Sequence, residues 1–479
     1  MMKRNSQYSL IVLVFLQLVI LVSSCKAPAL SLRNENVLLP AKYADTSDTI
    51  NSSTIDWRSY FADDNLTALI DTAFKNNQDL NIISLEIEIL NNEVMAKSGE
   101  YKPFVNINAG AEEEKQGEFT RNGAVDEQLK IKDGKKFPSP LGNFIVQTNF
   151  NWELDIWKKL RNAKKSAVLR YLASIEGRNF AKTRLVAEIA SSYYELMALD
   201  NLASIIDQNI VIQSNALEVV RKQKEAAGVT QLAVNRFEAQ LLNTQNRQYE
   251  IKQRIVETEN KINFLTGRYP VPVNRNSQIF TQLSVDAILA GVPSQLLKNR
   301  PDIRQSELLL SAAKLDVDVA RARFYPSVGI RAGLGLNAFN PLYLINPQSL
   351  AFNLAGDLVG PLVNKNAIKV AYASAGASQV QAVFTYEQTI LTAYLDVLNQ
   401  LSKMEKFTKS FETKSKEVEI LDQSVIIANS LFNSARADYA EVLLTQKEAL
   451  ESRIDLVETK MKQLDGKINI YKALGGGWQ

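Results

Sequence analysis

Four segments of this chain alternate apolar residues with polar or small ones, a period of two that predicts strands with two different faces. In one segment, Val146, Phe150 and Trp152 share the apolar face, whereas Asn149 and Asn151 share the polar face. The four predicted strands span about residues 102–112, 144–156, 326–337 and 349–360. Their length of about ten residues and their two-faced pattern are typical of a transmembrane β-barrel. The alternative is a soluble sheet with one solvated face.

The polar faces of these strands predict the wall of a water-filled lumen. Its expected polar side chains are Asn149, Asn151, Glu153, Asp155, Arg331 and Asp357. Four strands are too few to close a barrel, and each backbone group left unpaired in lipid costs several kcal/mol. We therefore expect several copies of the chain to share one barrel. The polar linkers at 112–143 and 338–349 are expected to be loops on the outer side.

A second period, of 3.5 residues, runs through the longest segments of the chain. Steps of four and three residues from Leu185 to Lys224 meet nine apolar residues at twelve positions. This repeat is typical of a left-handed coiled coil. It predicts two proline-free helical hairpins, at about residues 159–266 and 364–473. At about 1.5 Å per residue the longer helices extend on the order of 100 Å, which is enough to cross a periplasm.

The chain is organised as a duplication. Residues 101–110 return as 324–333, and residues 227–267 return 208 positions later as 435–475. Each copy combines two strands with one long helical hairpin, which predicts a repeated architecture rather than a single asymmetric pocket. The expected parts are a first repeat at 65–270, a connecting equatorial segment at 271–300, a second repeat at 301–474 and a C-terminal tail at 475–479.

The first residues have the features of a secretory signal. Lys3 and Arg4 precede an apolar run at 10–22 that is too short to span a bilayer and ends in small residues before Cys25. The sequence LVSSC resembles a bacterial lipobox, which predicts lipid attachment at Cys25. The predicted parts are a signal peptide at 1–24 and a lipidated, extended segment at 25–64. The alternatives are an uncleaved signal anchor and an idle thiol.

The composition excludes several kinds of enzyme. The chain has no histidine and a single cysteine, so it can form neither a histidine-based catalytic triad nor a zinc site with histidine ligands. It also lacks a GxSxG turn, which leaves little support for a hydrolase with helical stalks. The formal charge of +3, with both signs interspersed, does not indicate a nucleic-acid partner. We expect no enzymatic activity, no cofactor and no metal site.

Several motifs carry a resemblance to a known family. GVPSQLLKNRPDIRQSE at 291–307, followed by VARARFYPS at 319–327, resembles the middle motif of TolC-family outer-membrane efflux lipoproteins. The ending YKALGGGW at 471–478, NWELDIW at 151–157 and the AGVT turn at 227–230 are similar to the same family. The resemblance covers nearly the whole chain after the signal. It indicates the NodT-like branch of outer-membrane factors that serve RND-type tripartite efflux systems.

The resemblance implies a fold, a location and a role. The implied fold is an α+β membrane protein, a homotrimer in which four strands per chain form a twelve-stranded transmembrane β-barrel, continued by a long α-helical coiled-coil barrel in the periplasm. The implied location is the outer membrane of a Gram-negative bacterium, where the chain is lipid-anchored and contacts outer-membrane lipid. The implied role is a passive exit duct for small molecules. An inner-membrane RND-type pump and a periplasmic membrane-fusion adaptor deliver these molecules.

The resemblance also places the adaptor contact at the turns of the two hairpins. The residues concerned are Ala227, Gly228, Val229, Thr230, Ala435, Arg436 and Ala437. The second turn departs from the family, which usually has a glycine followed by a small apolar residue in place of Ala435 and Arg436. A C-cap glycine at the end of a helix is the alternative interpretation of Gly228.

Two further groups of residues have a functional and a structural interpretation. Asp438 and Glu441 are a candidate periplasmic gate, since they form acidic rings after threefold assembly. The alternative is that they are favourable acids at a helix N-terminus. The belt motif comprises Arg300, Pro301, Asp302 and Arg304. Proline at a helix start and an acid at the positive end of the helix dipole are ordinary capping features, so we expect the belt motif to be structural.

Three alternatives to a duct for drugs, detergents and other amphiphiles stay open. The first is a periplasmic coiled-coil scaffold without a pore. The second is a type I protein-secretion outlet, the nearest rival within the duct hypothesis. The third is a heavy-metal efflux duct for copper or silver. Soft metals prefer sulfur ligands, and the six methionines form no stripe along a predicted lumen.

Overall fold

The computed structural model describes residues 27–43, 51–131, 134–284, 289–361, 363–434 and 436–478. The predicted signal peptide and the predicted lipid attachment at Cys25 lie outside these residues. The chain divides into two compact units. Glu88–Tyr171 and Leu308–Val383 belong to the first, and Glu35–Ile87, Leu172–Glu307 and Phe384–Gln479 form the second.

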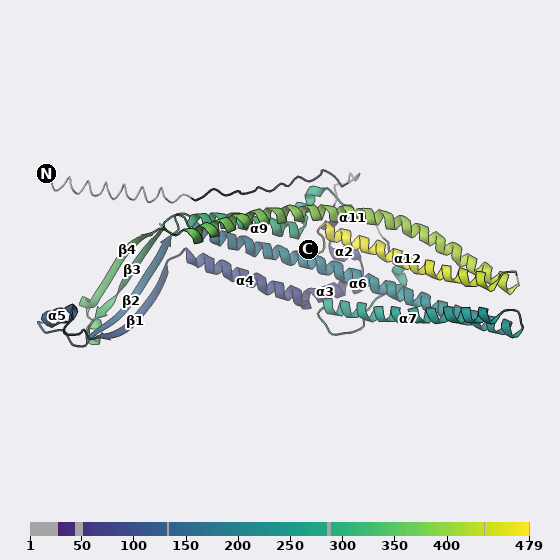
Figure 1. Ribbon diagram of the computed structural model, residues 1–479, viewed down its shortest axis with the longest axis horizontal. Coiled ribbons are helices and arrows are strands. Elements are labelled where there is room, and N and C mark those ends of the chain that lie inside the picture. Colours follow the sequence, from purple (N-terminus) through teal and green to yellow (C-terminus); the bar gives the residue numbers. More distant parts are fainter. Residues whose placement is uncertain are drawn as a thin grey trace. The chain divides into compact units, whose positions relative to one another are not determined.

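The first unit contains an antiparallel sheet of four strands in the order β1-β2-β3-β4. The strands are β1 (Phe104–Glu114), β2 (Leu141–Leu154), β3 (Ser327–Ala338) and β4 (Leu350–Val359), and Figure 1 shows them side by side. All four predicted strands are present. The linkers expected to be loops contain the short helices α5 (Arg121–Gln128), α10 (Pro341–Leu344) and η4 (Pro347–Ser349).

The register of the strands gives the sheet two chemically different faces. Asn149 of β2 lies opposite Asn106 of β1 and Gly333 of β3, and Gly333 lies opposite Asn353 of β4. Because directly opposed residues share a face, polar and small residues of all four strands lie together. The other face is apolar and includes Val105, Phe150, Ala332 and Leu354.

Two long helical hairpins follow the strands, as the 3.5-residue repeat predicts. The first joins α6 (Lys159–Glu225) to α7 (Gln231–Leu265), and the second joins α11 (Asn366–Asn433) to α12 (Tyr439–Ala473). In the second unit α7 runs beside α6, and α12 runs beside α11 (Figure 1). Of the helices that the structure describes, none combines the length and the apolar character needed to span a bilayer.

The core of the second unit forms where the apolar seam of α6 is covered. The buried seam residues include Ile189, Leu196, Leu199 and Ile206. They belong to one cluster with Val457, Leu464 and Ile468 of α12, and each such buried side chain contributes about 1.5–3 kcal/mol. Ile212 and Val219, farther along α6, stay 41% and 43% exposed. These two side chains therefore remain uncovered in the single chain.

Shorter helices complete the fold. They are η1 (Ser52–Thr54), α2 (Trp57–Phe61), α3 (Asp64–Asn76), α4 (Gln78–Glu100), η2 (Ser277–Gln282), η3 (Pro293–Gln295), α8 (Leu296–Asn299) and α9 (Pro301–Ala322). Helix α9 begins at Pro301 because the first helical position does not need the backbone N–H that proline lacks. Asp63 is the N-cap of α3, and its carboxylate accepts a hydrogen bond from the Leu66 N–H at 3.0 Å.

Candidate functional site

The polar face of the sheet holds an ion pair between two predicted lumen residues. Arg331 Nε lies 2.6 Å from Asp357 Oδ2, and Arg331 Nη2 lies 2.8 Å from Asp357 Oδ1. Arg331 is also directly opposite Asn151 of β2. Three of the predicted polar side chains, Asn151, Arg331 and Asp357, therefore lie together on β2, β3 and β4. The bidentate geometry of the ion pair fixes the relative orientation of its two side chains.

Gly333 makes room for two amide side chains on the same face. A Cβ at this position would overlap the Gln147 amide and stand 2.5 Å from Asn353 Oδ1. Asn149 is the direct partner of Gly333 on β2. The absence of a side chain at Gly333 thus lets polar groups of neighbouring strands lie across β3 on the polar face of the sheet.

The two acids at the end of β2 have different surroundings. Glu153 lies in the strand and pairs with Lys159, with 2.6 Å between Oε1 and Nζ. Asp155 lies beyond the strand in which we predicted it, and its carboxylate accepts hydrogen bonds from the Leu160 and Arg161 N–H groups, both at 2.9 Å. Burial raises the pKa of Asp155, but these hydrogen bonds outweigh burial and lower it. Asp155 therefore caps the start of α6.

The belt motif is built around a buried arginine. The Arg300 side chain is 7% exposed, and its guanidinium donates to Asp302 Oδ1 and Oδ2 at 3.0 and 2.7 Å. It also donates to the Ala473 carbonyl oxygen at 3.0 Å. Burial lowers the pKa of Arg300, but the charges and hydrogen bonds of Asp302 and Asp396 outweigh burial and raise it. The guanidinium is therefore held in its charged form.

The C-terminal tail packs against the belt motif. Gly475 has a φ of +91°, and a Cβ there would stand 2.5 Å from the Asn299 carbonyl oxygen. Arg304 Nη2 lies 2.6 Å from Oε1 of the buried Glu176, and its guanidinium lies 6.0 Å from the ring centroid of Trp478. The RPDIR and GGGW motifs thus form one packed junction, and these contacts support a structural role for the belt.

The first hairpin turn ends α6 with a left-handed alanine. Ala227 has a φ of +58°, whereas Gly228 is outside the left-handed region. The Gly228 N–H donates to the Gln223 carbonyl at 2.8 Å and the Ala227 N–H to the Lys224 carbonyl at 3.0 Å. This is the Schellman pattern, with Ala227 at the position that glycine usually occupies. The C-cap interpretation of Gly228 is therefore wrong.

One capping hydrogen bond of the first hairpin turn recurs in the second despite the different residues. The Arg436 N–H donates to the Leu431 carbonyl at 2.9 Å, which is the counterpart of the bond from Gly228 to Gln223. Ala435 lies outside the described residues. The departure from the family pattern at Arg436 thus leaves this capping bond in place.

The N-caps after the two turns differ. Thr230 caps α7, since its hydroxyl accepts a hydrogen bond from the Ala233 N–H. Asp438 occupies the same position before α12, but its side chain makes no capping hydrogen bond. Asp438 and Glu441 are both exposed, and the gate hypothesis for them stays a prediction.

Apolar side chains hold the two hairpins together behind their turns. Leu217, Val220 and Phe237 of the first hairpin form a buried cluster, and Phe432 and Tyr439 of the second pack against it. Val229 of the predicted adaptor contact packs there too. The two predicted tips therefore lie close together. Within the described ranges, no group of three or more His, Cys, Asp or Glu side chains is placed to hold a metal ion.

Comparisons with known proteins agree with this geometry. The family described as outer membrane efflux protein matches residues 69–268 and 292–476. The chain is 25% identical over 428 residues to the solvent efflux pump outer membrane protein SrpC of Pseudomonas putida, which covers 88% of this chain and 87% of SrpC. It is 24% identical over 423 residues to the cation efflux system protein CusC of Escherichia coli O6:H1, which covers 88% of each chain.

A solved structure has the same fold. The open state of the MtrE outer membrane channel of Neisseria gonorrhoeae is 21% identical and covers 95% of this chain and 98% of that chain, with a TM-score of 0.81. The expected resemblance and fold class, with four strands per chain and long helical hairpins, are confirmed.

Proposed function

Because this chain belongs to the outer membrane efflux protein family, we propose that it is the passive, lipid-anchored exit duct of a tripartite pump for small amphiphilic molecules. Three copies form the duct. An RND-type pump in the inner membrane supplies the energy, and a periplasmic membrane-fusion adaptor connects the pump to the hairpin turns. A lipid on Cys25 adds an anchor in the outer membrane.

The edges of the sheet carry this proposal. β1 and β4 are the outer strands, and neither pairs on its outer side with another strand of the described part of the chain. Every residue of β1 is exposed. Since unpaired backbone groups are not stable in lipid, β1 of one copy must pair with β4 of the next. Three four-stranded sheets then close a barrel of twelve strands, a size typical of outer-membrane barrels.

The polar face of the sheet supports an aqueous lumen. Gln147, Asn149 and Asn353 lie on it together with the pair formed by Arg331 and Asp357. The apolar face, with Phe150 and Leu354, is suited to lipid. A wall of wetted polar groups passes a solute without a dedicated site, which is what a passive duct requires.

Relatives support small organic molecules as the cargo. SrpC is named as part of a solvent efflux pump. Soft metals prefer sulfur ligands, and this chain has one cysteine and six methionines, which form no stripe along the predicted lumen. The second candidate cargo is a metal cation, which the likeness to the cation efflux system protein CusC favours. The two cargoes predict different sensitivities of cells that lack the duct.

Cells test the cargo. A deletion strain, with and without a plasmid copy of the gene, is exposed to dyes, detergents, antibiotics, and copper or silver salts, while dye retention is followed by fluorescence. We expect sensitivity to chemically unrelated amphiphiles and raised dye retention, both reversed by the plasmid. Sensitivity confined to the metal salts would replace the amphiphile proposal with the cation duct.

Planar bilayers test the pore itself. The purified full-length protein is expected to be a trimer and to give stepwise ion currents. A Cys25→Ser variant separates the anchor from the pore, since it removes the lipid site and leaves the strands unchanged. We expect the variant to conduct like the wild type and to bind membranes less firmly. A folded wild-type protein without any current would contradict the duct and favour a scaffold.

A further inference from the structure

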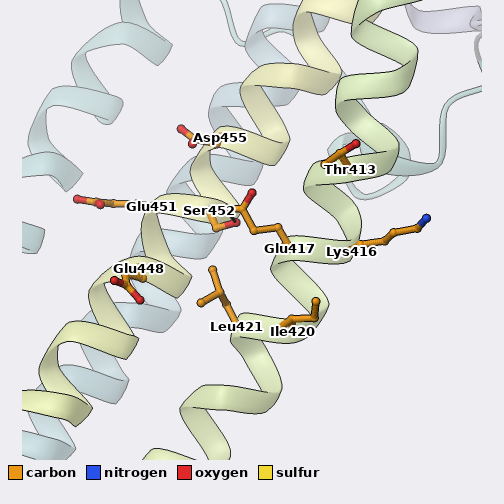
Figure 2. A pocket seen from close by; sticks show the side chains of 9 residues that line it. All are labelled: Thr413, Lys416, Glu417, Ile420, Leu421, Glu448, Glu451, Ser452 and Asp455. Carbon is orange, nitrogen blue, oxygen red and sulfur yellow. Dashed lines mark hydrogen bonds between the residues drawn. The ribbon is translucent and has the colours of Figure 1, made fainter.

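A groove of about 790 Å³ lies between α11 and α12 in the second unit. Its lining residues are Thr413, Lys416, Glu417, Ile420, Leu421, Glu448, Glu451, Ser452 and Asp455. Figure 2 shows the first five on α11 and the last four on α12, with Leu421 reaching from α11 toward α12. Ile420 is 64% exposed. The groove thus offers apolar contact surface between two helices.

The groove is acidic. Four of its lining residues are carboxylates and one is a lysine, Lys416, which points away from α12 (Figure 2). Lys414 of α11 forms ion pairs with two of these carboxylates. Its Nζ lies 3.0 Å from Glu417 Oε1 on the same helix and 3.0 Å from Asp455 Oδ2 on α12. Glu448 forms no ion pair with any described residue, and Glu451 has only a contact of 3.9 Å with Lys447. Two carboxylates on α12 are therefore available to an incoming cation.

The same groove positions in the first repeat are not acidic. The residues 208 positions earlier than the four carboxylates are Asn209, Gln240, Asn243 and Arg247. The fold of the hairpin therefore does not require acids at these positions. The negative charge is a property of the second hairpin alone, and two of its four acids, Glu448 and Glu451, form no ion pair with a described residue of α11.

The neighbouring groove has the opposite charge. It lies between α7 and α12 and has a volume of about 520 Å³. Its charged lining residues are Arg236, Arg247, Lys447 and Glu451, the last of which lines both grooves, so three cations face one acid. Helix α12 thus separates an acidic groove from a basic one. A cationic partner is attracted by the first groove and repelled by the second, so the charges select one groove as well as the kind of partner.

We propose that the groove between α11 and α12 binds an amphipathic helix of the periplasmic partner that carries lysine or arginine beside its apolar face. This proposal rests on the proposed function, which supplies a periplasmic partner. Apolar residues of the helix contact Ile420 and Leu421, and its cations pair with Glu448 and Glu451. Helix-in-groove binding of this kind combines apolar contact with a polar rim that sets the register.

A synthetic helical peptide tests the proposal. Its probe form has leucines on one face and lysines beside them, and its control form has glutamates in place of the lysines. Binding to the full-length protein in detergent is measured by fluorescence anisotropy at low and high salt. We expect the lysine peptide to bind more tightly than the glutamate peptide, and the difference to shrink at high salt.

Matched variants locate the binding site. The double variant Glu448→Gln with Glu451→Asn carries the residues found at the corresponding positions of the first repeat. We expect it to bind the lysine peptide about fivefold more weakly at low salt. The control, Glu250→Gln with Glu257→Gln, removes two exposed charges of α7 outside the groove and should leave binding unchanged. Equal binding of the two peptides, or equal loss in both double variants, would overturn the proposal.

A photo-cross-linking residue in place of Ile420 tests the other occupant, a second copy of this chain. We expect it to capture the lysine peptide. Capture of a second copy in the purified protein would overturn the proposal. Planar-bilayer currents of the same preparation keep the two proposals apart, because normal currents without peptide binding reject only the docking groove, whereas a folded protein without currents rejects the duct.

Discussion

The Arg300 guanidinium donates a hydrogen bond to the Ala473 carbonyl oxygen over 3.0 Å and so joins the start of α9 to the end of α12. The last carbonyl groups of a helix have no partner within the helix, and a cation there also interacts favourably with the helix dipole. Because the same guanidinium holds Asp302 in the first turn of α9, one side chain stabilises two helix ends.

Replacing Arg300 with alanine is expected to destabilise the protein strongly. The substitution leaves the Asp302 carboxylate, 14% exposed, and the Ala473 carbonyl without their guanidinium donor. Breaking a buried pair in this way costs about 3–5 kcal/mol. Thermal and chemical unfolding of the purified protein measure the loss. Arg58→Ala is the control, since it breaks an exposed pair with Asp71 and should cost below about 1 kcal/mol. Similar losses in both variants would contradict the role of Arg300.

The first hairpin turn is expected to gain stability from glycine at position 227. Ala227 has a left-handed φ of +58°, which costs an alanine about 1 kcal/mol. Ala227→Gly should therefore slow hydrogen exchange of the turn amides about fivefold. Gly228→Ala is the matched control, because its nearest new contact would be at 3.4 Å. Faster exchange in Ala227→Gly would show that the left-handed position is elsewhere.

These residues also show how much of the fold the sequence could predict. The strands and hairpins depend on local periods, so their presence and the two faces of the sheet could be predicted. Asn149 and Asn151, for example, lie on the expected polar face. The left-handed position of the first hairpin turn is harder to predict, because glycine is the usual residue there and nothing in the sequence marks Ala227 as its replacement. The alternating pattern predicts a strand at Asp155, although an aspartate shortly before a helix is also a capping signal.

The packed junction between the RPDIR and GGGW motifs could not be predicted from local sequence patterns. Arg300 and Ala473 are 173 positions apart, and no periodicity relates the RPDIR motif to the C-terminal tail. Only the packing of α9 against the end of α12 brings them together. The charge of the groove at Glu448 and Glu451, by contrast, could have been found by aligning the two repeats, since the counterparts are Gln240 and Asn243.

The gate hypothesis predicts larger currents after neutralisation of Asp438 and Glu441. If acidic rings close the duct, Asp438→Asn with Glu441→Gln should raise the open fraction in planar bilayers. Thr230→Ala is the matched control, because Thr230 occupies the corresponding N-cap position of α7 and its loss affects helix stability by about 1 kcal/mol. Unchanged currents in the double variant would leave both acids as favourable charges at a helix N-terminus.

The lumen hypothesis predicts a change of ion selectivity at Asp357. Asp357→Asn removes the negative partner of Arg331, which is 65% exposed, and leaves an uncompensated cation on the polar face. The zero-current potential in a salt gradient should then shift toward anion preference. Glu127→Gln is the control, since Glu127 lies in the linker helix α5 and is 73% exposed. Equal potentials in wild type and Asp357→Asn would place this face away from the ion path.

The cap at the start of α6 predicts a pH-dependent stability. The folded-state pKa of Asp155 is below its ordinary value, so the ionised carboxylate stabilises the fold above that ordinary value, and this contribution is lost as the pH falls through the lowered pKa. Asp155→Asn should therefore cost about 1 kcal/mol at neutral pH, and the difference from the wild type should disappear in acid. Chemical unfolding of both proteins across this pH range measures it. A constant difference at every pH would mean that the hydrogen bonds to Leu160 and Arg161 do not depend on the charge of Asp155.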